Sequence, residues 1–117
     1  MINLENKNII LTGATGGIGK TIVETLTSLN AKVLITGTNE TKLEELKIKN
    51  KNIISIKQDI SIHNELEAFI EKCSKEFDDK IDILINNAGV TKDNLTIRMN
   101  KDEWDKVINI NLTSTFL

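Results

Sequence analysis

"TGATGGIG" (residues 12–19) decides the fold class of this chain. The stretch directly follows the β-branched run NIIL (8–11), and from Ile18 onward apolar residues recur at helical spacing. Small residues between a strand and a helix let the backbone approach a pyrophosphate, and the first N–H groups of the helix point at its charge. The stretch therefore predicts a nucleotide-binding turn, with an ordinary glycine-rich strand–helix turn as the alternative.

Three further segments have the pattern of buried strands, namely KVLITG (32–37), NIISIKQ (52–58) and IDILINNAG (81–89). Amphipathic helical patterns separate these segments. Because strand and helix alternate, we predict an α/β fold, a Rossmann-like doubly wound parallel sheet. Right-handed crossovers give the strand order 3-2-1-4, with the remaining strands of such a sheet missing. The glycine turn then opens onto the crevice between strands 1 and 4, where open α/β sheets bind ligands.

Two helix starts are predicted from polar residues. Ser61 is expected to cap the helix that follows the third strand, because its hydroxyl can accept a hydrogen bond from a first-turn N–H group. Asn100 is expected to cap the last helix, with Glu103 in the capping-box position. On this last helix Asn111 shares a stripe with Trp104, so its amide is predicted to face the interior and to be hydrogen-bonded there. Trp104 is expected to anchor the helix on the rest of the fold.

Composition excludes several classes of function. The chain has 117 residues, a formal net charge of −2 and scattered basic residues, which argues against a nucleic-acid partner. No apolar run reaches membrane-spanning length, and MINLENKN (1–8) lacks the features of a signal peptide. Its single cysteine, Cys73, suits a reducing compartment, so we expect a cytoplasmic protein without a membrane partner. Neither Cys73 nor His63 has metal-ligand spacing, and no metal site is expected.

TGATGGIG, together with NNAG (86–89), resembles the short-chain dehydrogenase/reductase family, whose patterns are T-G-x-x-x-G-x-G and N-N-A-G. Asp59, in QDIS, matches the family acid that contacts the adenine of the cofactor. The resemblance extends over the whole chain. The cofactor-binding residues that it implies are Gly13, Ala14, Thr15, Gly16, Gly17, Ile18, Gly19, Thr38, Asp59, Ile60, Asn87, Ala88 and Gly89.

A narrower resemblance is carried by NNAGVTKDNLTIRMNKDEWDKVININL (86–112), which is similar to a segment of the bacterial 3-oxoacyl-[acyl-carrier-protein] reductases, with Lys92 in place of the usual Arg. It implies NADPH-dependent reduction of a 3-oxoacyl thioester on acyl-carrier protein, in fatty acid biosynthesis, by a homotetramer. Acetoacetyl-CoA reductases share much of this stretch, so that activity, or another short-chain dehydrogenase, is the alternative. Asn111 matches the catalytic Asn of the family, which holds a water in a proton relay; a purely structural Asn is the other interpretation.

The end of the second strand predicts the choice of cofactor. An acid at this position would bind the ribose 2′-hydroxyl of NAD and repel the 2′-phosphate of NADP. Gly37 stands there, followed by Thr38, a neutral donor that suits a phosphate, and NADP is therefore expected. At Gly16 many NADP-using relatives carry an Arg, for which Lys20 could partly substitute.

The chain contains no tyrosine. In the resembled family a Tyr protonates the substrate oxygen, a Lys four residues later lowers its pKa, and a Ser orients the carbonyl. We therefore expect residues 1–117 to be the N-terminal dinucleotide-binding part of a single Rossmann domain, truncated in the region of its fifth helix and inactive alone. A stand-alone nucleotide-binding module and a split-gene product that assembles with a complementary chain are the alternatives.

Overall fold

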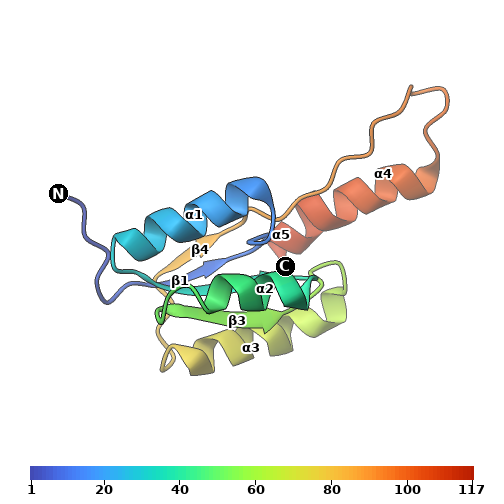
Figure 1. Ribbon diagram of the computed structural model, residues 1–117. Helices are drawn as coiled ribbons and strands as arrows, with labels where there is room; N and C mark the ends of the chain where they lie inside the picture. Colours follow the sequence, from blue (N-terminus) through green and yellow to red (C-terminus); the bar gives the residue numbers. More distant parts are fainter.

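The computed structural model describes all residues from Met1 to Leu117. At its centre lies a four-stranded sheet in the order β3-β2-β1-β4 (Figure 1), which confirms the predicted order. Every pairing is parallel; Ile10, for example, pairs with Leu34 on one side and with Leu84 on the other. The strands are β1 (Asn8–Leu11), β2 (Lys32–Gly37), β3 (Ile53–Lys57) and β4 (Ile83–Ile85).

Helices cover both faces of the sheet, as a doubly wound fold requires (Figure 1). Alternate strand residues point to opposite faces, so each strand contributes to two cores. Ile9 and Val33 pack in the core beneath α1 (Gly17–Ser28) and α2 (Glu40–Lys47). The other core holds Phe69 and Cys73 of α3 (Leu66–Glu76), packed against the opposite face of β1 and β2. Burial there raises the pKa of the Cys73 thiol to about 12.

The segment after β4 leads away from the sheet. The loop of residues 90–100 and α4 (Lys101–Ile108) together form an arm that projects beyond the other elements (Figure 1). The predicted capping box is confirmed, because Asn100 Oδ1 accepts from Glu103 N–H at 2.9 Å and Glu103 Oε2 accepts from Asn100 N–H at 3.0 Å. The helix continues as a π-helical turn, η2 (Asn109–Thr113), and ends in α5 (Ser114–Phe116).

Three local predictions were wrong. Trp104 does not anchor α4, since its side chain is 60% exposed on the arm. Ser61 caps no helix; its N–H donates to Asp59 Oδ1 at 2.9 Å, and α3 begins only after a short 3-10 turn, η1 (His63–Glu65). The fourth strand ends at Ile85 instead of residue 89, because the N–H groups of Asn87 and Ala88 donate to the side chain of Thr12, the residue after β1.

None of the helices combines the length and the apolar character needed to cross a bilayer.

Candidate functional site

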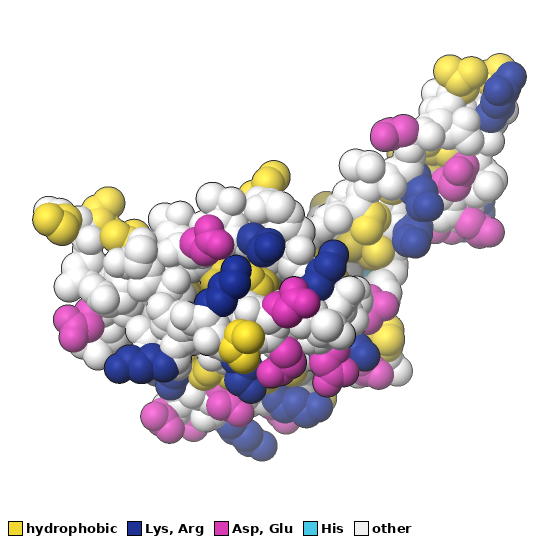
Figure 2. All heavy atoms as spheres, in the orientation of Figure 1, with side chains coloured by type: hydrophobic (Ala, Val, Ile, Leu, Met, Phe, Trp, Pro, Cys, Tyr) yellow, Lys and Arg dark blue, Asp and Glu magenta, His cyan; other side chains and the backbone are white.

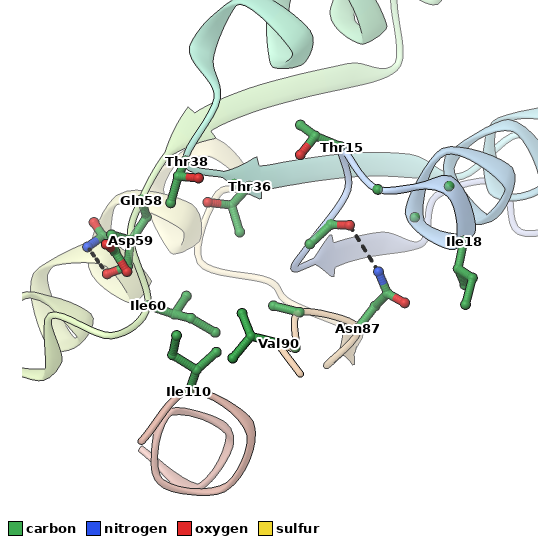
Figure 3. A pocket seen from close by; sticks show the side chains of 17 residues that line it. Thr15, Ile18, Thr36, Thr38, Gln58, Asp59, Ile60, Asn87, Val90 and Ile110 are labelled. Carbon is green, nitrogen blue, oxygen red and sulfur yellow. Dashed lines mark hydrogen bonds between the residues drawn. The ribbon is translucent and has the colours of Figure 1, made fainter. Parts of the chain in front are cut away.

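A cavity of about 460 Å³ opens at the carboxyl ends of the strands, between the glycine turn and the π-helical turn η2 (Figure 3). Of the predicted cofactor-binding residues, those that line it are Gly13, Thr15, Gly16, Gly17, Ile18, Gly19, Thr38, Asp59, Ile60, Asn87, Ala88 and Gly89. Ala14 does not line it. This residue is 0% exposed in the core below, where its N–H donates to the Thr36 carbonyl at 3.2 Å.

The glycines of the turn have two different roles. Gly13 has a φ of +65°, and a Cβ there would lie 2.7 Å from Ala88 Cα. A Cβ at Gly19 would lie 2.2 Å from the Gly13 carbonyl oxygen. Gly13 is therefore required where the turn packs against the NNAG segment, and Gly19 where the turn packs against itself. At Gly17, by contrast, an added Cβ would meet no protein atom within 4 Å. Gly17, which also lines the cavity, therefore adjoins open space.

The amino end of α1 presents unpaired donors at this cavity. The first N–H group of this region with a helical acceptor belongs to Lys20, which donates to the Gly16 carbonyl at 2.9 Å. The N–H groups of Gly17, Ile18 and Gly19 have no backbone acceptor, and no side chain caps the helix. The first turn carries no acidic residue either. Unpaired donors and the positive end of the helix dipole suit a phosphate group.

Hydrogen bonds join the NNAG segment to the glycine turn. Thr12 Oγ1 accepts from the N–H groups of Asn87 and Ala88 at 3.1 and 3.0 Å. Asn87 Nδ2 donates to the Gly13 carbonyl at 3.0 Å, the dashed line on the right of Figure 3. These bonds end the β4 ladder and fix two walls of the cavity to each other. The segment 87–89 is therefore held beside the turn by the chain itself.

Asp59 forms the far wall of the cavity, opposite the glycine turn (Figure 3). Its Oδ1 accepts from Ser61 Oγ at 2.6 Å and from Ser61 N–H at 2.9 Å. These two bonds lower the pKa of Asp59 from its ordinary value, and the side-chain bond contributes most. The charge of Lys106 makes a smaller contribution in the same direction. The carboxylate is thus ionised at neutral pH and can accept a hydrogen bond from a ligand amino group.

Asn111 does not line the cavity, but it is hydrogen-bonded to Val90, which does. Its side chain is exposed, contrary to the predicted buried face, yet both ends of its amide are paired with one residue. Oδ1 accepts from Val90 N–H at 2.8 Å, and Nδ2 donates to the Val90 carbonyl at 2.9 Å. The amide is hydrogen-bonded, as predicted, but it is not buried.

Sequence reasoning missed four lining residues, which are Thr36, Gln58, Val90 and Ile110. Thr36 and Gln58 lie at or just after the carboxyl ends of β2 and β3, so the rule that ligands bind at strand ends could have found them. Val90 directly follows the NNAG segment. Ile110 comes from η2, whose approach to the sheet is a tertiary contact without a local sequence signal.

A smaller cavity of about 140 Å³ lies between α1 and α2, where Figure 2 shows basic side chains gathered. Its lining residues are Thr15, Lys20, Lys42, Glu45, Leu46 and Lys49. Thr15 lines both cavities, which makes them neighbours. None of the three lysines takes part in an ion pair. Elsewhere, no group of three or more His, Cys, Asp or Glu side chains is arranged to hold a metal ion.

Comparison with known proteins agrees with this geometry. The family model described as short chain dehydrogenase matches residues 7–117. The chain is 42% identical over 118 residues to the 3-oxoacyl-[acyl-carrier-protein] reductase FabG of Rickettsia conorii, covering 100% of this chain and 47% of that protein. It is 39% identical over 116 residues to the FabG of Escherichia coli K12, covering 98% of this chain and 47% of the relative.

Solved structures give the same result. A short-chain dehydrogenase/reductase (glucose/ribitol dehydrogenase) from Brucella melitensis superposes with a TM-score of 0.91 at 29% identity, over 98% of this chain and 48% of that one. A 3-ketoacyl-(acyl-carrier-protein) reductase from the same organism, complexed with NADH, has a TM-score of 0.90 at 27% identity, with coverages of 98% and 48%. The chain thus spans about half the length of the relatives it matches. It belongs to the short-chain dehydrogenase family.

Proposed function

We propose that residues 1–117 form the nucleotide-binding part of an NADPH-dependent reductase that converts an acyl-carrier-protein-bound 3-oxoacyl thioester to its 3-hydroxyacyl form. The observation that carries this proposal is the row of unpaired N–H groups of Gly17, Ile18 and Gly19 at a cavity of about 460 Å³. Such a row at a helix amino terminus is matched to a pyrophosphate. The open space beside Gly17 leaves room for that group, so the residues present fit a dinucleotide.

Each wall of the cavity has a role toward the cofactor. The N–H groups at the start of α1 bind the pyrophosphate, and the ionised Asp59 accepts from the amino group of the adenine. Asn87, Ala88 and Gly89 lie along the adenosine ribose, at the position where hydrogen bonds hold them beside the glycine turn. When bound, the reduced nicotinamide supplies a hydride to the carbonyl carbon of the substrate. This chain's own contribution is to bind and orient that cofactor.

The proposed preference for NADPH over NADH is supported by the charges beside the adenosine end of the cavity. Gly37 places no carboxylate at the end of β2, and Thr38 offers a hydroxyl to the cavity. Across Thr15 lies the smaller cavity, whose three unpaired lysines face a single acid, Glu45. This local positive charge favours a 2′-phosphate and supplies the cations that Gly16 lacks.

The substrate assignment rests on the segment 86–112 and on the relatives named 3-oxoacyl-[acyl-carrier-protein] reductase. An acetoacetyl-CoA reductase, or another short-chain dehydrogenase, is the second candidate, because the same segment is similar to both reductases. The proposed enzyme is a cytoplasmic homotetramer of fatty acid biosynthesis.

Asn111 is proposed to hold a water of the proton relay. The general acid is proposed to come from outside these residues. The chain contains no tyrosine that could protonate the substrate oxygen. We place the Tyr, Lys and Ser of the family in a following segment of a longer polypeptide, of which residues 1–117 are the N-terminal part. A hydride cannot be delivered productively unless the developing alkoxide is protonated or stabilised, so binding of NADPH alone gives no turnover.

The test compares the intact protein with residues 1–117 expressed alone. NADPH oxidation is followed with acetoacetyl thioesters of acyl-carrier protein and of coenzyme A, and NADPH binding is measured by calorimetry. We expect both proteins to bind NADPH, only the intact protein to turn over, and the carrier-protein thioester to be preferred. Failure of the intact protein to bind NADPH would refute the proposal; a preference for the coenzyme A thioester would favour the second candidate. Turnover by residues 1–117 would mean that the chain holds its own general acid.

A further inference from the structure

Thr36 carries the one buried side-chain polar atom in the chain that has no hydrogen-bond partner, its Oγ1. The residue is 1% exposed, near the carboxyl end of β2, and it lines the nucleotide cavity. Thr12, a buried threonine that follows β1, differs sharply. Its hydroxyl contacts the Ile85 carbonyl and accepts from the N–H groups of Asn87 and Ala88. A buried hydroxyl without a partner costs free energy of folding, so its presence at a binding site calls for an explanation.

The position of Thr36 indicates which part of a ligand it faces. In Figure 3 it lies near Thr38 and Gln58, with Asp59 and Ile60 on the adjoining wall, and away from Ile18 at the start of α1. Its methyl group points toward the open centre of the cavity and its hydroxyl toward Thr38 and Gln58. A χ1 rotation that moves the hydroxyl into the present position of the methyl group would turn the hydroxyl to the cavity side. A hydroxyl can both donate to a ring nitrogen and accept from an amino group.

We infer that Thr36 is a further binding residue of the cavity, whose hydroxyl hydrogen-bonds the adenosine half of the bound dinucleotide. This inference rests on the proposed function, because it requires a dinucleotide in the cavity. The bond satisfies Oγ1 only in the complex. The free protein therefore carries an unpaired hydroxyl, and the complex does not. Removing the hydroxyl must then weaken binding without destabilising the free protein.

The decisive variant is Thr36→Val, made in the intact protein, because valine replaces the hydroxyl by a methyl group of nearly the same shape. We expect the Kd for AMP and for NADPH, measured by calorimetry, to rise roughly three- to tenfold, the range of one net hydrogen bond. The melting temperature of the free protein should stay the same or rise. Thr36→Ser retains the hydroxyl and should bind AMP within about twofold of the wild type. Thr41→Val, at an exposed threonine of α2 outside the cavity, is the matched control and should change neither quantity.

Several results would overturn the inference. An unchanged Kd for AMP in Thr36→Val would do so whatever the melting temperature, and a lower melting temperature with unchanged Kd would show that the hydroxyl has an internal partner instead. Should Thr36→Val not fold, the wild type is titrated with AMP while the Thr36 methyl signal is followed by NMR. A saturable change of its χ1 rotamer supports the inference, and an unchanged rotamer contradicts it. A wild type that binds neither AMP nor NADPH would refute the proposed function itself, which separates the two failures.

Discussion

The side-chain amide of Asn111 and the backbone of Val90 form a reciprocal pair of hydrogen bonds, at 2.8 and 2.9 Å. Asn111 lies on the π-helical turn η2, and Val90 follows the NNAG segment that lines the cavity. The pair therefore connects η2 to the cavity wall at Val90, where the arm begins. Because both ends of the amide are occupied, the Asn111 side chain holds this wall in position.

Replacement of Asn111 should release Val90. Asn111→Leu removes both bonds, and we expect a loss of about 0.5–1.5 kcal/mol in the free energy of unfolding, together with faster hydrogen exchange of the Val90 amide. Asn111→Asp keeps the acceptor and loses the donor, so the Val90 amide should remain protected in that variant. Urea denaturation and hydrogen exchange by NMR measure the two effects. Equal exchange at Val90 in all three proteins would show that the contact does not restrain the wall.

The two kinds of glycine in the turn should respond differently to substitution. Gly17→Val places a side chain in open space at a residue that lines the cavity, so we expect NADPH affinity to fall at least about tenfold with little change in stability. Gly19→Ala brings a Cβ to 2.2 Å from the Gly13 carbonyl oxygen, and this variant should lose about 2 kcal/mol or more of stability. Calorimetric titration and thermal melts distinguish the two. If Gly17→Val binds NADPH normally, the phosphate does not lie beside Gly17.

Charge at the end of β2 should control the choice of cofactor. A Cβ at Gly37 would meet Thr15 Cγ2 and Oγ1 at 3.5 Å, an ordinary van der Waals distance, so a side chain fits there. Gly37→Asp should lower the ratio of NADPH to NADH affinity by about tenfold or more, because the carboxylate repels a 2′-phosphate and accepts from a 2′-hydroxyl. Gly37→Asn, of similar size and without charge, is the control and should change the ratio far less. An equal change in both variants would attribute the effect to size.

Asp59 predicts a dependence of stability on pH. Its pKa is lowered in the folded protein below the ordinary value of 3.8, so its stabilising contribution is present above that value and is lost as the pH falls through the lowered pKa. Ser61→Ala removes the largest cause, the side-chain hydrogen bond, and should move the pKa of Asp59 upward. The stability advantage of the wild type over this variant should be greatest near neutral pH and should shrink in acid. Carboxyl NMR titration measures the shift.

Asp82 provides an internal control in the same titration. Its pKa is lowered chiefly by the N–H group of Asn8, at the opposite end of the sheet, and should be identical in both proteins. An Asp59 pKa that is equally low in Ser61→Ala would show that the side-chain bond does not cause the shift, and would leave the Ser61 N–H bond and Lys106 as its causes.

The sheet order and most of the cavity could be predicted from the sequence because both follow from local patterns. Alternation of strand and helix, with right-handed crossovers, leaves few arrangements for four parallel strands. TGATGGIG and NNAG come directly after β1 and β4, and strands that are neighbours in a parallel sheet bring their carboxyl ends together. Asp59 and Ile60 come shortly after β3, so the same rule places them at the cavity.

The features that sequence missed depend on contacts between distant segments. β4 is short because Thr12 takes the N–H groups of Asn87 and Ala88, a bond across 75 and 76 positions of the chain. Trp104 lies exposed because the arm projects from the sheet, although its helical stripe has the pattern of a buried face. The sequence predicts Ser61 as a helix cap, whereas the carboxylate of Asp59, two residues earlier, accepts hydrogen bonds from its hydroxyl and its N–H group.

The central claim is that the amino end of α1 binds the pyrophosphate of NADPH. The most direct measurement is an NMR titration of the isotope-labelled protein with NADPH, in which the backbone N–H signals of Gly17, Ile18 and Gly19 are followed. We predict saturable downfield shifts of these three amides, as expected for donors that gain a charged acceptor, together with smaller changes at Asp59 and Ala88. Binding of NADPH that leaves these three signals unchanged, or shifts only residues outside the cavity, would contradict the account.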